Sequence, residues 1–173
     1  MILPVELKAI LTTIRLVGTP KTVLEIGCYE GHTSNACLKE FPSIEKYYGL
    51  DVNPEYKAGL KVQERQRAGV PGKHALHDQR FKLILLPRGS FDLDVFTVGR
   101  PDVIFIDGDH SAKAVRHDTD LARSIVQPGG VIMWHDYGNP HGEVTGVLDA
   151  DVEKGHPIRY VDKTWLAYEQ IDK

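Results

Sequence analysis

The chain has 173 residues, 42% of them hydrophobic and 26% charged, a composition typical of a globular protein with one core. Its 21 basic and 24 acidic residues give a net charge of −3, which argues against a nucleic-acid partner because such surfaces carry excess Lys and Arg. Two cysteines are too few for a disulfide framework, and no apolar run approaches the roughly 20 residues that cross a bilayer. Because the first residues also lack a signal-peptide pattern, we expect a cytoplasmic protein with no membrane partner.

Short apolar runs alternate with helical patterns, and this order predicts an α/β fold with a largely parallel, buried sheet. The expected helices cover residues 6–17, 33 or 34 to 41, 55–67, 91–97, 111–126 and a stretch ending near 154. The expected strands cover residues 22–26, 47–51, 81–86, 102–107, 131–134, 157–161 and 164–170. We expect a doubly wound sheet with helices on both faces and a C-terminal antiparallel hairpin. All of it belongs to a single domain over residues 1–173, in which residues 1–20 supply a helix that packs on the sheet.

The first expected strand runs into a turn that begins at Gly27 and ends at Gly31. In a doubly wound sheet, ligands bind beyond the carboxyl ends of the strands, and glycine there lets the backbone approach a ligand closely. The N–H groups that open the next helix can bind a negative group such as a carboxylate. Asp51 ends the second strand at roughly the twenty-residue offset of an acidic side chain that accepts hydrogen bonds from ribose hydroxyls.

The same turn discriminates between nucleotide cofactors. Dinucleotide-binding proteins carry G-x-G-x-x-G at this place, whereas here Tyr29 replaces the middle glycine and Glu25 adds negative charge. A diphosphate is therefore disfavoured, while a cationic cofactor with a zwitterionic tail is tolerated. A nicotinamide-dependent oxidoreductase on the same fold class is the alternative that the missing glycine opposes.

Five features lie in the order found in class I S-adenosylmethionine-dependent methyltransferases. They are Glu25-x-Gly27-x-x-x-Gly31, Asp51, Ser90, Asp107 and Pro128-Gly129-Gly130, and the sequence resembles that family over roughly residues 20–150. Residues 105–110 and 134–137 are similar to the branch with sugar and macrolide O-methyltransferases. The resemblance implies a Rossmann-like methyltransferase sheet that binds S-adenosylmethionine.

The resemblance also implies positions for the cofactor. Glu25 and Gly27 line its methionine part, Asp51 holds the ribose, and the turn at Gly89 and Ser90 lies beside the adenine. Many relatives carry an acidic residue just before that serine, and the Arg88-Gly89-Ser90 sequence departs from this pattern. The full set expected to bind the cofactor is Glu25, Gly27, Cys28, Tyr29, Gly31, Asp51, Val52, Gly89, Ser90 and Asp107.

Acidic and imidazole side chains follow two strands that are neighbours in this fold. Carboxylates and imidazoles together suit a divalent metal such as Mg²⁺, Mn²⁺ or Fe²⁺, which would lower the pKa of an acceptor hydroxyl. The metal-dependent O-methyltransferases that the chain resembles imply ligation by Asp107, His135 and Asp136. His135 is a departure, because relatives often place a second acid there, and imidazole suits Mn²⁺ or Fe²⁺ better than Mg²⁺.

His110 is the expected general base. It lies three residues after Asp107, and its ordinary pKa near 6.5 suits removal of a hydroxyl proton. The alternative is that His110 caps the helix that begins near Ser111. The expected catalytic residues are His110, Asp107 and Asp136.

The function expected from these residues is in-line methyl transfer from S-adenosylmethionine to the hydroxyl of a small-molecule acceptor, with or without a metal. A module that binds S-adenosylmethionine without catalysis is the second alternative. Because the chain is short and no inserted lid is evident, we expect one of two arrangements. Either a partner subunit of a homodimer completes the acceptor pocket, or the acceptor binds in an open cleft.

Overall fold

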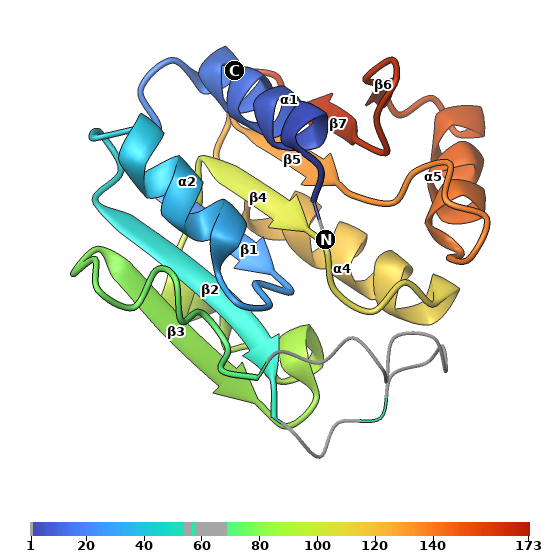
Figure 1. Ribbon diagram of the computed structural model, residues 1–173. Helices are drawn as coiled ribbons and strands as arrows, with labels where there is room; N and C mark the ends of the chain where they lie inside the picture. Colours follow the sequence, from blue (N-terminus) through green and yellow to red (C-terminus); the bar gives the residue numbers. More distant parts are fainter. Residues whose placement is uncertain (1, 54–56, 58–68) are drawn as a thin grey trace.

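The computed structural model describes residues 2–53, 57 and 69–173, and within these residues seven strands form one sheet in the order β3-β2-β1-β4-β5-β7-β6 (Figure 1). The strands are β1 (Thr22–Ile26), β2 (Lys46–Val52), β3 (Phe81–Leu86), β4 (Val103–Ile106), β5 (Val131–Trp134), β6 (Arg159–Tyr160) and β7 (Ala167–Gln170). β1 to β5 are mutually parallel, and β7 runs antiparallel to both β5 and β6. The expected mostly parallel sheet with a C-terminal antiparallel hairpin is confirmed.

The helices are α1 (Pro4–Ile14), α2 (His32–Glu40), α3 (Val95–Val98), α4 (Ala112–Ile125) and α5 (Val144–Glu153). The expected single helix over 91–97 is wrong, because a 3₁₀ turn (Gly89–Asp92) and α3 occupy this stretch separately. The Asp94 side chain accepts a hydrogen bond from the Phe96 N–H and so caps the N-terminus of α3. The expected helix over 55–67 lies, apart from residue 57, outside the described residues.

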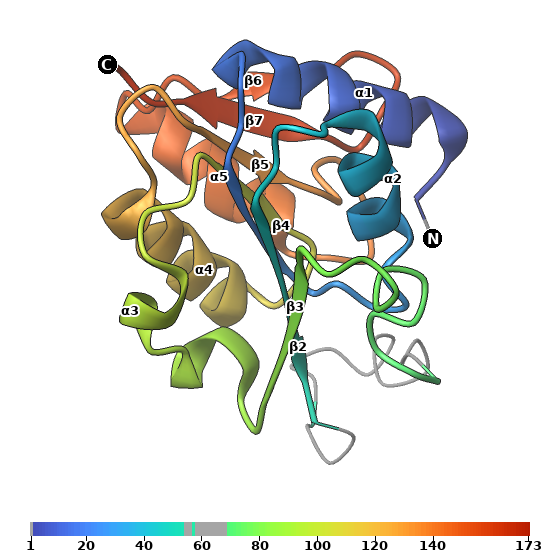
Figure 2. The ribbon, with the colours of Figure 1, turned by 90° about the vertical axis from the view of Figure 1, so that its left-hand side faces the viewer.

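Alternation along the strands divides the core between two faces of the sheet. On β1, Val23 packs toward α1 and α2, whereas Leu24 and Ile26 pack toward α4 and α5. Figure 2 shows α2 on one side of the sheet and α3 and α4 on the other. Helices on both faces are therefore confirmed, and α1 packs against the sheet through Ile10 and Ile14.

The parallel strands place the carboxyl ends of β1 to β5 at one edge of the sheet, as the arrowheads of β2, β3 and β4 show in Figure 1. This edge is where ligands bind in doubly wound sheets. In the part of the chain that the structure describes, no helix combines the length and the apolar character needed to span a membrane.

Candidate active site

The turn after β1 is fixed by the strands on both sides. The N–H groups of Gly27 and Cys28 donate to the carbonyl oxygen of Leu50 on β2, at 2.8 and 3.2 Å. Gly27 has a φ of +87°, and a Cβ atom there would lie 2.2 Å from the carbonyl oxygen of Asp107. Glycine is required because the chain leaving β1 touches the chain leaving β4. The turn and the end of β4 therefore belong to one site.

Asp51 links this turn to the end of β2. Its Oδ2 accepts a hydrogen bond from the N–H of Tyr29 at 2.7 Å, and its Oδ1 accepts one from the N–H of Val52 at 2.8 Å. Tyr29 has a φ of +47°, a backbone conformation uncommon for a residue with a Cβ atom. A carboxylate has about four acceptor positions, so these two bonds leave Asp51 able to accept from ligand hydroxyls.

Glu25 lies in the interior of the protein, between α2 and β2. Its carboxyl group is 2% exposed and accepts hydrogen bonds from the hydroxyls of Ser34 on α2 and Tyr47 on β2. Burial raises the pKa of Glu25 to about 8, so the group is largely protonated at neutral pH. Because the carboxyl group is largely protonated, the expected repulsion between Glu25 and a diphosphate is weak.

The sequence predicts Thr33 or Ser34 as the N-cap of α2, because hydroxyl residues favour that position, but neither residue caps the helix. The helix begins at His32, directly after Gly31, which has a φ of +80° and takes the N-cap position. Both hydroxyl residues therefore lie inside the helix and are buried. Ser34 binds Glu25 instead of a free backbone N–H of the first turn.

At the end of β3, Ser90 is held by an acid that the sequence analysis did not identify. Its hydroxyl donates to the carboxyl group of Asp118 on α4, and burial raises the pKa of that carboxyl to about 6. Next to it, the ring of Phe91 stacks on His117 with centroids 4.0 Å apart. A Cβ on Gly89 would lie 3.0 Å from the Val52 side chain, so the ends of β2 and β3 are in close contact.

Four side chains from the ends of β4 and β5 converge as expected. Nε2 of His110 lies 3.5 Å from Oδ1 of Asp107 and 3.2 Å from Oδ2 of Asp136. Nδ1 of His135 lies 3.4 and 3.0 Å from the same two oxygens. Asp136 itself has a φ of +61°, a rare conformation of the kind that concentrates at functional sites.

The contacts within the cluster shift the pKa of each of these groups in the direction opposite to the shift caused by burial. Burial disfavours the charged form of His135, but hydrogen bonds and charges from Asp107 and Asp136 outweigh it and raise the pKa of that imidazole to about 11. Burial disfavours the charged form of His110 too, but Asp107 and Asp136 again outweigh it and raise the pKa. Against its own burial, the two imidazoles lower the pKa of Asp107 to about 2. Asp107 and His135 therefore carry opposite charges at neutral pH.

Ser111 takes the N-cap position of α4, so His110 lies one residue ahead of the cap. The first free N–H of α4, that of Ala112, donates to Oε2 of Glu143 at 2.7 Å. The N–H of Ser111 donates to Oδ1 of Asp109 at 2.9 Å. The His110 imidazole lies against two acids of the cluster, Asp107 and Asp136.

The donor atoms of the cluster fit a divalent metal. One ligand atom from each of Asp107, His110 and Asp136 lies within 4.8 Å of the other two. Two carboxylate oxygens and a ring nitrogen form a donor set that suits Mn²⁺ or Fe²⁺. His135, which was expected as a ligand, borders the same oxygens through Nδ1.

Glu6, from the first turn of α1, also reaches this cluster and was not identified from the sequence. Its Oε1 lies 3.4 Å from Nε2 of His135, and its carboxyl group is buried. Oε2 accepts a hydrogen bond from the N–H of Leu3 at 2.8 Å. In the sequence, Glu6 is an acid in the first turn of an amphipathic helix. That position alone predicts only a favourable interaction with the helix dipole.

A family model described as "Methyltransferase domain" matches residues 24–137, more than half of the chain, from β1 to the loop after β5. The chain belongs to this methyltransferase family. Membership confirms the resemblance to class I S-adenosylmethionine-dependent methyltransferases and argues against a nicotinamide-dependent oxidoreductase.

Solved structures share the fold of this methyltransferase. The O-methyltransferase NovP is 14% identical with a TM-score of 0.70, over 96% of this chain and 79% of that one. The SAH-bound methyltransferase PaMTH1 of Podospora anserina is 16% identical with a TM-score of 0.67, over 100% and 80%. The O-methyltransferase TomG of Streptomyces achromogenes, in complex with SAM, is 14% identical with a TM-score of 0.61, over 95% and 78%. At these identities the similarity establishes the fold alone.

One curated relative is similar in sequence. It is a protein of Acanthamoeba polyphaga mimivirus named "Uncharacterized protein R132", 29% identical to the methyltransferase over 121 residues. The match covers 67% of this chain and 51% of that protein, so the chain spans about half the length of this relative.

Proposed function

We propose that this methyltransferase transfers the methyl group of S-adenosylmethionine to a hydroxyl oxygen of a small-molecule acceptor. The observation that carries the proposal is the packing of Gly27 on the backbone of Asp107, which joins the cofactor turn to the acid–imidazole cluster. Methyl transfer needs these two parts side by side, because the acceptor oxygen must approach the sulfonium methyl in line with the bond that breaks.

For the cofactor, we propose the residues expected from the sequence. Asp51 accepts hydrogen bonds from the ribose hydroxyls, and the backbone from Cys28 to Gly31 faces the methionine part. Val52, Gly89 and Ser90 border the adenine, and the Asp118 carboxyl keeps the Ser90 hydroxyl oriented. When bound, S-adenosylmethionine supplies an electrophilic methyl group on a positively charged sulfur.

For the acceptor, we propose that His110 removes the hydroxyl proton. Asp107 and Asp136 orient its ring and stabilise the imidazolium that forms, because both carboxylates lie within 3.5 Å of Nε2.

Assistance by a divalent metal is a separate proposal. Asp107 and Asp136 supply its oxygen ligands, and His135, or His110 where it is not the base, supplies the ring nitrogen. A metal there would lower the pKa of the acceptor hydroxyl. Calorimetry with MnCl₂ tests this: we expect one equivalent to bind, and Asp136→Asn to weaken it at least tenfold. Unchanged Mn²⁺ binding in that variant would show that the metal does not bind at this cluster.

The test of the main proposal is His110→Ala, assayed with a panel of hydroxylated sugars, macrolides and catechols. We expect its affinity for S-adenosylmethionine to stay within about twofold, while S-adenosylhomocysteine formation falls by about 10²-fold or more. His77→Ala is the matched control, since His77 is exposed in a loop far from the cluster in sequence. If His110→Ala turns over like the control, another group is the base.

A homodimer and a cytoplasmic location also stay predictions. Light scattering of the purified chain measures the first, and we expect twice the mass of one chain. A partner subunit would then complete the acceptor pocket.

A further inference from the structure

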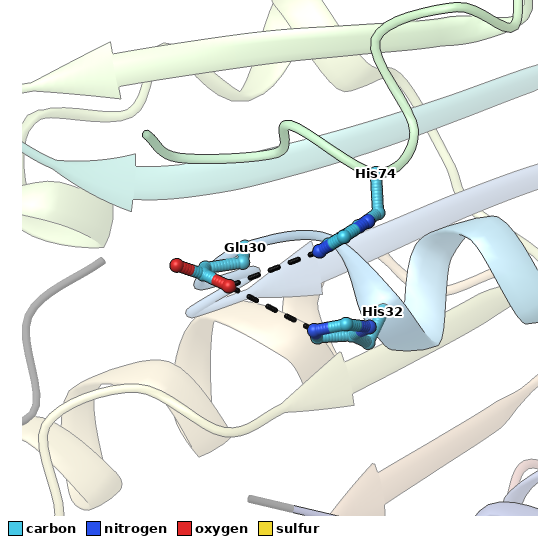
Figure 3. Close-up of side chains that lie close together, drawn as sticks. All are labelled: Glu30, His32 and His74. Atoms are coloured by element: carbon cyan, nitrogen blue, oxygen red, sulfur yellow. Dashed lines mark ion pairs between the residues drawn. The ribbon is translucent and has the colours of Figure 1, made fainter. Parts of the chain in front are cut away.

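A second cluster of ligating side chains lies outside the catalytic residues. It consists of Glu30 in the turn after β1, His32 at the first position of α2, and His74 in the segment before β3 (Figure 3). Nε2 of each histidine lies 3.8 Å from the same carboxylate oxygen, Oε2 of Glu30. The two rings stack with centroids 3.9 Å apart and planes inclined by 28°. Figure 3 shows both Nε2 atoms facing the carboxylate from one side.

Backbone contacts fix this arrangement independently of the side chains. The N–H of Gly72 donates to the carbonyl of Tyr29 at 2.7 Å, and the N–H of His74 donates to the carbonyl of Glu30 at 3.0 Å. Gly31, with a φ of +80°, lies so close that a Cβ there would be 2.9 Å from the carbonyl oxygen of Gly72. Two segments distant in sequence are therefore docked together, and their side chains need little ordering to act jointly.

We propose that Glu30, His32 and His74 form a zinc site at the edge of the cofactor turn. Two imidazole nitrogens and one carboxylate oxygen are a common three-ligand set for Zn²⁺, with water in the fourth position. Ligands at about 2.0–2.1 Å in a tetrahedron lie about 3.3 Å apart, so the observed 3.8 Å separations require shifts of about half an ångström. The His32 side chain is 64% exposed and free to make that adjustment. This proposal does not depend on the methyl transfer proposed above.

Lys73 is the competitor of the metal. Its Nζ lies 2.8 Å from Oε2 of Glu30, the oxygen that both histidines face. Because the lysine side chain is 41% exposed, its ion pair is weak and its ammonium group can move into water when a metal arrives. A neutral side chain at this position should therefore strengthen metal binding.

A metal here would join the cofactor turn to the segment before β3. Glu30 directly follows Tyr29, whose N–H is bound to Asp51, so the zinc site shares its backbone with the expected ribose site. Binding would stiffen the turn without occupying the position of the cofactor.

Calorimetry with ZnCl₂ on the full chain tests the proposal, with Asp107→Asn/Asp136→Asn as the background that disables the catalytic cluster. In this background we expect one equivalent of Zn²⁺, bound at least tenfold more weakly after His32→Ala or His74→Ala. His77→Ala, an exposed histidine of the same segment, is the matched control and should leave binding unchanged. Lys73→Gln should bind several-fold more tightly, a gain that a misfolded variant would not produce.

Cobalt gives a spectroscopic check of the geometry. Co²⁺ in the same background should show the intense visible bands of tetrahedral coordination, and Glu30→Gln should weaken them. The proposal is overturned if the background binds no Zn²⁺, or if binding survives both histidine substitutions unchanged. It is also overturned if Lys73→Gln does not bind more tightly.

Discussion

The backbone N–H of Tyr29 donates a 2.7 Å hydrogen bond to Oδ2 of Asp51, and this bond ties the turn after β1 to the end of β2. The acid expected to hold the ribose is therefore also a support of the turn that faces the methionine part of the cofactor. Cys28 lies against the same oxygen, with its sulfur 3.8 Å away. One carboxylate thus fixes the position of the turn after β1 relative to the end of β2.

Asp51→Asn should weaken binding of S-adenosylmethionine by about tenfold or more, because the amide has one acceptor oxygen in place of two. Calorimetric titration measures this affinity. Asp162→Asn, an exposed acid in the turn between β6 and β7, is the control and should bind like the unaltered chain. Equal affinity in both variants would remove Asp51 from the cofactor site.

Gly27→Ala should lower the free energy of unfolding by at least about 2 kcal/mol. The new Cβ would lie 2.2 Å from the backbone of Asp107, at a φ of +87° that alanine adopts poorly. Gly146→Ala is the matched control, since nothing lies within 4 Å of a Cβ there and the residue is inside α5. That substitution should stabilise the chain by up to about 1 kcal/mol in chemical denaturation. Similar losses in both variants would contradict the close approach of β1 and β4.

Glu25→Gln should make stability less dependent on pH between about pH 4 and pH 8. The pKa of Glu25 is raised to about 8 in the folded chain, against about 4.3 in the unfolded chain. Between these values the folded chain holds a proton that the unfolded chain releases, so stability falls as pH rises through this window. The loss reaches the order of 5 kcal/mol above pH 8.

Glutamine does not titrate, so the melting temperature of Glu25→Gln should fall less between pH 5 and pH 9 than that of the unaltered chain. Thermal unfolding at a series of pH values measures both curves. Parallel curves would show that the carboxyl of Glu25 is ionised in the folded chain.

Asp151 should govern stability in acid. It is 1% exposed on α5 and is bound by Arg116 at 2.7 Å and Arg123 at 2.6 Å, both on α4. Against its own burial, these guanidinium groups lower the pKa of Asp151 to about 2, below about 3.9 when unfolded. Its contribution of about 2.5 kcal/mol is present above pH 4 and is lost as the pH falls toward 2.

Asp151→Asn should cost about 3 kcal/mol at pH 7, because it leaves the partly buried Arg123 with one charged partner fewer. Urea denaturation measures the loss. Glu45→Gln, which breaks the exposed pair with Lys21, should cost less than about 1 kcal/mol. Comparable losses from the two substitutions would show that burial adds nothing to the Asp151 contacts.

The sheet and its functional edge were predictable because buried parallel strands are short apolar runs that end in polar residues. Val103 to Ile106 is apolar on both faces, and Asp107 follows where the chain leaves the core. The same reasoning predicts that Asp107, His110 and Asp136 lie together, because neighbouring parallel strands end at the same edge of the sheet.

The sequence contains a signal for the burial of Glu25, namely its position within the first strand. Alternation along β1 places Glu25 on the same face as Val23, beneath α2, where a charge is costly. Asp118 and Glu6 were not predictable in this way. Each reaches the site from a helix face, and which turn of a helix meets which strand end depends on packing that a single sequence does not reveal.

Glu6 changes how the domain can be dissected. Glu6, in the first turn of α1, contacts the imidazole of His135 after β5. Helix α1 therefore borders the acid–imidazole cluster as well as packing on the sheet. Removing α1 from this chain would leave His135 without the carboxylate that faces its Nε2 atom, so a shortened domain must retain that helix.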